Sequence, residues 1–138
     1  MNYSLLFLHQ NTENMKALVF IFLGGGIGSV LRYLISMCIN QRTAGVFPWG
    51  TLVVNISGCV LIGFFYALSS RMQISNEMRL LLTIGLCGGF TTFSTFGNES
   101  LQLLKSGLYL SFFTYVCGSL ILGISGVMLG TWFGNNLR

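Results

Sequence analysis

The chain has 138 residues, of which 53% are hydrophobic and only 7% carry a charge, and its formal net charge is +4. Soluble domains carry about 25% charged residues, so this chain has too few to coat a water-facing surface, and we expect one all-α integral membrane domain. The seven Lys and Arg residues are spread along the sequence. They form no basic face or arm, which argues against a nucleic-acid partner.

Residues 1–14 are expected to be an N-terminal extension, and residues 15–138 a single four-helix transmembrane domain. The short apolar stretch 5–8 has no basic residue before it, so it does not fit a secretory signal peptide. Met15 and Lys16 stand directly before the first long apolar run and are an equally good start of the domain. We therefore treat residues 1–14 as a frayed extension.

The first predicted membrane span covers about residues 17–39, which is long enough because about 20 helical residues cross a bilayer core. Glycines at 24–26 and 28 would let another helix approach closely. Arg32 is unusual, because a charge inside a span is costly and is usually kept for a function. The alternative is that Arg32, which lies in the second half of the span, extends to the membrane interface.

The second predicted span covers about residues 50–69, after a loop that contains Pro48 and an interfacial Trp49. Asn55 is the one strongly polar residue of this span. It either hydrogen-bonds a neighbouring helix, as asparagines in membranes commonly do, or lines a pore.

The third predicted span, about residues 78–104, contains the stretch TIGLCGGFTTFSTFGNE from Thr83 to Glu99. Its glycines favour helix poorly, and hydroxyls alternate with phenylalanines. Polar groups and freed backbone are tolerated at membrane depth only where they face protein or water. We predict a helix that is broken near Gly88 and Gly89 and lines an ion pathway. Carbonyls freed near Gly88 and Thr91 could hold an ion the size of Na⁺; a kink sealed by neighbouring helices is the alternative.

The fourth predicted span covers about residues 108–133, with Gly126, Gly130 and Gly134 forming a ridge for close packing. Tyr115 and Ser119 lie on one face of this helix. Four spans place both termini on one side of the membrane. That side has only slightly more Lys and Arg than the other, so a cytoplasmic N-terminus is weakly favoured and insertion in both orientations is physically plausible.

The sequence offers no enzyme chemistry. Its only carboxylates are Glu13, Glu77 and Glu99, and none is at the middle of the first or second span. The four cysteines lie in apolar segments without a CxxC pair, and His9 is the single histidine. No catalytic set of Ser, His and Asp, no paired acids and no metal cluster can be assembled.

Hydrogen-bond donors are present instead, and they suit a small, strongly hydrated anion. The donors are Asn55, Ser94, Thr95, Tyr115 and Ser119, and Arg32 adds a positive charge. Phe93 and Phe96 could turn their positive ring edges toward an anion, although on composition alone plain core packing is the favoured explanation of these phenylalanines. Four helices are too thin to enclose a pathway, so a homodimer is the simplest closed assembly.

Three motifs resemble those of the small bacterial fluoride channels, the Fluc or CrcB family. They are GGGIGSVLRY in the first span, GTLVVNISG in the second and GLCGGFTTFSTF in the third. The third motif is highly specific, and the likeness covers the chain from about Ala17 to the C-terminus.

The resemblance implies a passive channel of the cell inner membrane that exports F⁻ and lowers its toxicity, built as an antiparallel, dual-topology homodimer with two pores. It implies pore roles for Asn55, Phe93, Phe96, Ser94, Thr95, Tyr115 and Ser119, and vestibule roles for Arg32 and Glu99. It also implies that the backbone carbonyls of Gly88 and Thr91 hold a structural Na⁺. One turn after Ser119, where some members have a further serine, this chain has Gly123.

Two other functions have to be weighed. A small drug or cation exporter of the four-helix, dual-topology type would need a buried acid in its first span, and this chain has none there. A structural subunit that only holds other membrane proteins would have no use for the run of hydroxyls and phenylalanines.

Overall fold

The computed structural model describes residues 3–43, 45–72 and 74–137, with side chains from Thr12 onward. Within this part, four helical stretches are long and apolar enough to cross a membrane. They are Thr12–Arg42, Trp49–Arg71, Asn76–Lys105 and Tyr109–Asn136. The prediction of an all-α fold with four spans is therefore confirmed, and the observed helices extend past the predicted bounds.

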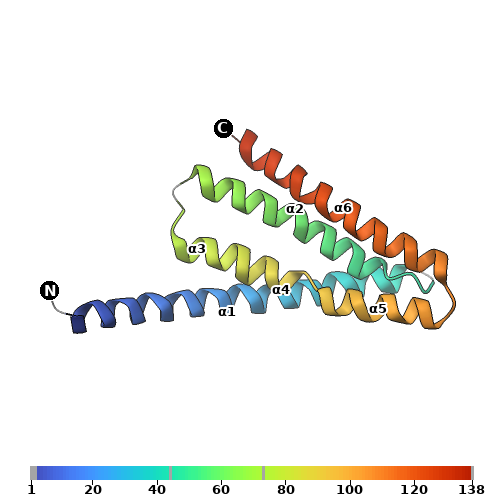
Figure 1. The fold of residues 1–138 in the computed structure, drawn as a ribbon, viewed down its shortest axis with the longest axis horizontal. Helices are drawn as coiled ribbons and strands as arrows, with labels where there is room; N and C mark the ends of the chain where they lie inside the picture. Colours follow the sequence, from blue (N-terminus) through green and yellow to red (C-terminus); the bar gives the residue numbers. More distant parts are fainter. Residues whose placement is uncertain (1–2, 44, 73, 138) are drawn as a thin grey trace.

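The chain reverses direction at each connection (Figure 1). Helix α1 (Tyr3–Arg42) is followed by α2 (Trp49–Arg71), by a third span made of several pieces, and by α6 (Tyr109–Asn136). The N-terminal end of α1 and the C-terminal end of α6 consequently lie toward the same side of the molecule, as four spans require. Helix α1 already begins at Tyr3, so the residues expected to form a frayed extension continue the first helix from that point; residues 1–2 are outside the described residues.

The glycine ridge of α6 packs against α2. Gly126, Gly130 and Gly134 are all buried, and a Cβ built on Gly130 would lie only 2.9 Å from the amide nitrogen of Phe64. Small residues of this kind let two helix backbones approach closely in a membrane. The predicted packing ridge is thus confirmed, and because α2 occupies it within one chain, the ridge by itself is no argument for a partner.

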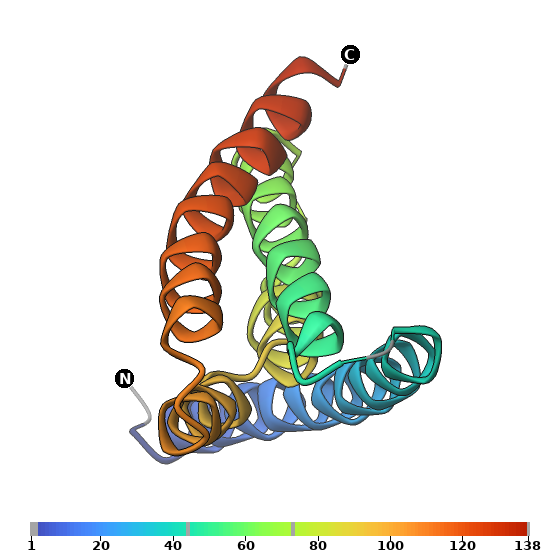
Figure 2. The same ribbon diagram turned by 90° about the vertical axis from the view of Figure 1, so that its right-hand side faces the viewer.

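The glycines of α1 pack against the third span in the same way. Gly24 and Gly28 are buried, and a Cβ on Gly85 would lie 2.9 Å from the carbonyl oxygen of Ile21. Figure 2 shows the resulting arrangement, in which α1 crosses along the third span while α2 and α6 form a second layer. The fold is therefore two helix pairs, each joined along glycines.

The third span consists of four pieces. They are α3 (Asn76–Leu80), a π-helical segment η1 (Leu81–Cys87), α4 (Gly88–Phe90) and α5 (Phe93–Lys105). The predicted break near Gly88 and Gly89 is wrong by a few residues, because both glycines are helical and the chain leaves the helix at Thr91 and Thr92. Thr91 has φ −86° and ψ 158°, and Thr92 has φ −148° and ψ 115°.

The break lies at the threonines because the glycine and threonine residues have different structural roles. Gly89 is needed for close contact, since a Cβ there would lie 3.0 Å from the Cα of Gly25 on α1. The two threonines are β-branched and adopt extended backbone readily. Gly89 therefore brings α4 against α1, and the threonines interrupt the helix.

Substituting Gly130 by alanine is expected to separate α6 from α2. The added methyl group would overlap the backbone of Val60 and Phe64, and overpacking of this kind costs about 1–3 kcal/mol. Gly26→Ala is the matched control, because a Cβ there meets nothing within 4 Å. Thermal unfolding in detergent should show a lower midpoint for Gly130→Ala only; equal midpoints for the two variants would contradict the packing described above.

Candidate functional site

A groove of about 330 Å³ runs between α2, the end of η1, the break and α6. We call it the break groove. Six of the predicted site residues line it, namely Asn55, Gly88, Thr91, Phe93, Phe96 and Ser119. No carboxylate is among the described residues that line it, and most of its wall is apolar. The sequence-predicted residues from three different spans are thus brought to one place.

Ser119 carries the most informative polar atom in this groove. Its hydroxyl oxygen is buried and has no hydrogen-bond partner among the described residues. A buried hydroxyl without a partner costs about 1–3 kcal/mol, so such a group calls for an explanation such as a bound ion or water. Ser119 therefore places a buried, unpaired hydroxyl in the wall of the break groove.

Tyr115 stands one turn before Ser119 but does not line the break groove. It is fully buried, and its hydroxyl donates to Glu99 Oε2 at 2.7 Å. Its ring contacts that of Phe96, with 5.0 Å between the centroids. The donor group of Tyr115 is thus already engaged with Glu99 within the chain.

The two phenylalanines of the predicted site differ in their surroundings. Phe96 packs partly against the buried cluster that contains Tyr115 and Leu103. Phe93 is 84% exposed and touches Phe96 with 5.8 Å between ring centroids. Core packing within the chain therefore accounts for Phe96 but not for Phe93.

Asn55 holds the break from the side of α2. Its Nδ2 donates to the carbonyl oxygen of Thr92 at 3.1 Å, and its Oδ1 accepts from the amide of Thr92 at 2.8 Å. The amide and the carbonyl of Thr92 are thereby both hydrogen-bonded, as the interior of a membrane requires. An asparagine amide has two N–H groups, so Asn55 bonds the neighbouring span and still faces the groove.

The hydroxyls after the break form a cap at the start of α5. Thr92 Oγ1 accepts from the amide of Thr95 at 3.2 Å and lies 3.3 Å from Ser94 Oγ. Ser94 and Thr95, predicted as pore residues, do not line the break groove. Thr92 does, and sequence reasoning missed it. Its position directly before a helix, where Thr commonly caps the first turn, is the signal that could have found it.

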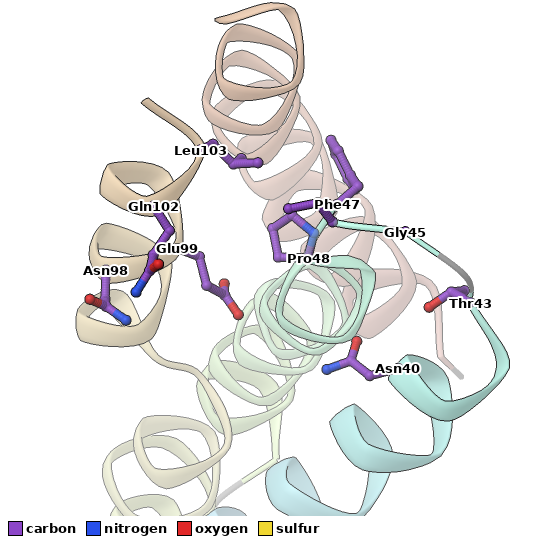
Figure 3. Close-up of a pocket in the computed structure, with 10 residues that line it drawn as sticks. Asn40, Thr43, Gly45, Phe47, Pro48, Asn98, Glu99, Gln102 and Leu103 are labelled. Atoms are coloured by element: carbon purple, nitrogen blue, oxygen red, sulfur yellow. The ribbon is translucent and has the colours of Figure 1, made fainter. Parts of the chain in front are cut away.

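A second pocket of about 380 Å³ lies where the connection between α1 and α2 faces α5. Figure 3 shows Asn98, Glu99 and Gln102 of α5 opposite Phe47 and Pro48 of the connection. The second carboxylate oxygen of Glu99 accepts from Thr51 Oγ1 at 2.8 Å. The structure thus places Glu99 in a vestibule-like pocket.

Arg32 is not among the residues that line this second pocket. It contacts the broken span instead, where its Nε donates to the carbonyl oxygen of Gly89 at 3.1 Å. Arg32 and Glu99, both predicted to have vestibule or electrostatic roles, therefore lie at two different places.

The described residues offer no group of three or more His, Cys, Asp or Glu side chains that could hold a metal ion. All four cysteines are free thiols, and His9 lies outside the described side chains. A cation at the break groove would therefore have to use backbone oxygens. Gly88 and Thr91 line the groove, and Gly88 is exposed with open space beside it.

Comparison with known proteins gives a consistent set of relatives. The family model described as "CrcB-like protein, Camphor Resistance (CrcB)" matches residues 19–131. A protein of Phocaeicola vulgatus named fluoride-specific ion channel FluC is 70% identical over 118 residues, covering 86% of this chain and 98% of the relative. Proteins of the same name from Bacteroides fragilis and Flavobacterium psychrophilum are 51% and 46% identical, covering 90% and 87% of this chain and 100% and 94% of their own lengths.

Replacing Asn55 by leucine is expected to leave the amide and carbonyl of Thr92 without their partners. The loss should lower the free energy of unfolding by about 1–3 kcal/mol. Ser57→Ala is a matched control on the same helix, because the Ser57 hydroxyl bonds only the carbonyl of Val53 in its own helix. Unfolding in detergent, followed by circular dichroism, measures both variants, and an unchanged stability of Asn55→Leu would show that the break does not depend on Asn55.

Proposed function

We propose that this chain, which belongs to the CrcB-like protein family, is the subunit of a channel that passes fluoride selectively through the break groove. The curated relatives that match nearly the whole chain are named as fluoride-specific ion channels. The expectation that the chain is not an enzyme is thereby confirmed, and the multi-pass membrane character agrees with the four spans.

The buried, unpaired hydroxyl of Ser119, a residue that lines the break groove, is the observation that carries the proposal. The groove adds the amide of Asn55 and the rings of Phe93 and Phe96, and no acid lines it among the described residues. Hydrogen-bond donors and positive ring edges can replace the water that a small anion gives up. A carboxylate in the same low-dielectric space would repel the ion, so the side chains of this lining favour an anion.

A second copy of the chain is needed to close the pathway. The break groove is open, and Phe93, which lines it, is 84% exposed in the single chain. A twofold arrangement is the simplest closed assembly. The weak difference in Lys and Arg content between the two sides of the membrane supports an antiparallel pair in which the two copies insert in opposite orientations.

A structural Na⁺ between the two copies fits the oxygens that the break leaves free. The amide of Thr92 is engaged by Asn55, so it no longer serves the carbonyl of Gly88 as it would in a continuous helix. The carbonyls of Gly88 and Thr91 are uncharged oxygen ligands of the kind that unwound membrane helices offer to Na⁺. Bound there, the ion would supply a positive charge at the centre of the assembly.

Passive conduction is sufficient for export from the cell. Hydrogen fluoride is a weak acid that enters uncharged and dissociates in the cytoplasm. An anion path in the cell inner membrane would then let the trapped F⁻ leave and lower its toxicity. The exporter alternative needs an acid buried within the first span, but the one carboxylate of Thr12–Arg42 is Glu13, which lies at the start of the span and pairs with Lys16. The scaffold alternative gives the groove no function.

Changing Phe93 or Phe96 to isoleucine is expected to reduce fluoride efflux by about tenfold or more, because the ring edges are lost while apolar volume is kept. Efflux is measured with a fluoride electrode from liposomes that hold the purified protein. Phe22→Ile is the matched control, since Phe22 is 79% exposed and lies on α1 away from the groove.

Wild-type protein that releases no fluoride, or that releases chloride as fast, would overturn the proposed function. If efflux is selective but Phe93→Ile and Phe96→Ile both behave like Phe22→Ile, the route does not pass the two rings. A scaffold would lose little with any of the three substitutions.

Removing Na⁺ is expected to destabilise the dimer. For a site filled at about 100 times its Kd, the loss is about 2.7 kcal/mol. Purified protein is compared in NaCl and in chloride salts of K⁺ or N-methyl-D-glucamine, at equal ionic strength, by thermal unfolding and by size-exclusion chromatography. Identical curves in all three salts would speak against the cation site.

A further inference from the structure

The break leaves the carbonyl of Gly89 without its ordinary partner. In a continuous helix this oxygen would accept from the amide of residue 93. Here two extended residues intervene, and Phe93 is the first residue of α5. Two side chains of α1 reach the oxygen instead, Arg32 through Nε at 3.1 Å and Ser29 through Oγ at 3.5 Å.

An arginine suits this position better than a neutral donor would. The carbonyl end of a helix carries a partial negative charge, and hydrogen bonds from a charged donor are stronger than neutral ones. Arg32 is only half-buried, but it is the one charged residue near the middle of its pair of helices. The hydrogen bond to Gly89 is a structural reason for keeping a charged residue inside the span.

The bond also determines which way the neighbouring carbonyls are presented. Gly89 faces α1, with its Cβ position 3.0 Å from the Cα of Gly25. Gly88, one residue earlier, is exposed on the side of the break groove. Fixing Gly89 on the inner side therefore fixes Gly88 on the outer side, and Thr91 follows two residues later.

We propose that Arg32, assisted by Ser29, is a positioning residue that holds the α4 end of the break so that the carbonyls of Gly88 and Thr91 keep the geometry for Na⁺. The inference rests on the proposed function only through this cation site. It assigns Arg32 a role at the broken helix in place of the vestibule role expected from the sequence. Arg32 and Asn55 then hold the two sides of the same break from two different helices.

The experiment measures how much Na⁺ is needed to stabilise the purified full-length protein. NaCl replaces N-methyl-D-glucamine chloride stepwise at constant ionic strength, and thermal unfolding gives the Na⁺ concentration of half-maximal stabilisation. Arg32→Gln is expected to raise this concentration by about tenfold or more, because a charge-assisted bond is lost. Arg42→Gln is the matched control, an exposed arginine in the last turn of the same helix, and should leave it unchanged.

An unchanged half-maximal concentration in Arg32→Gln overturns the inference, and so does a wild type that Na⁺ does not stabilise. If Arg32→Gln does not fold, Arg32→Lys is titrated in its place, because it keeps the charge but loses the Nε donor. Wild-type behaviour in Arg32→Lys then indicates a charge acting at a distance and overturns the inference. Fluoride efflux of the wild type is measured separately, so a failure of the proposed function is seen independently of the Na⁺ titration.

Discussion

A membrane interior provides no water for unpaired backbone groups, and this constraint explains most of the polar residues in the structure. The third span is interrupted at Thr91 and Thr92, which frees amides and carbonyls at membrane depth. Asn55 satisfies both backbone groups of Thr92, Arg32 satisfies Gly89, and the Thr92 side chain caps α5. The break is therefore a built feature, held from two neighbouring helices.

Glycine makes these contacts geometrically feasible. Arg32 reaches Gly89 because α1 and α4 approach closely, and the approach depends on positions such as Gly28, whose Cβ would lie 2.8 Å from the amide nitrogen of Phe90. The same principle joins α6 to α2. The side-chain hydrogen bonds at the break thus depend on the close packing of α1 against the third span and of α6 against α2.

The sequence was sufficient for the four spans, for the α6 ridge and for half of the residues that line the break groove. Apolar length and glycine spacing are local properties, and they report on spans and packing directly. The position of the break was not predicted correctly, because glycine content does not distinguish a helix that bends from one that packs tightly. The roles of Arg32 and Tyr115 could be seen only in the structure. The spacing of residues along one helix does not show which residue of another helix will be the hydrogen-bond partner.

The distribution of satisfied and free donors explains how one carboxylate can coexist with an anion path. Glu99 accepts from both Thr51 and Tyr115, so its negative charge is partly balanced by two donors. The Tyr115 ring contacts Phe96 on one side and Phe47 on the other, which places it between the groove and the vestibule-like pocket. Glu99 lines only that pocket, whereas Ser119, whose hydroxyl is buried and has no hydrogen-bond partner among the described residues, lines the groove. The acid and the unpaired donor therefore belong to two different cavities.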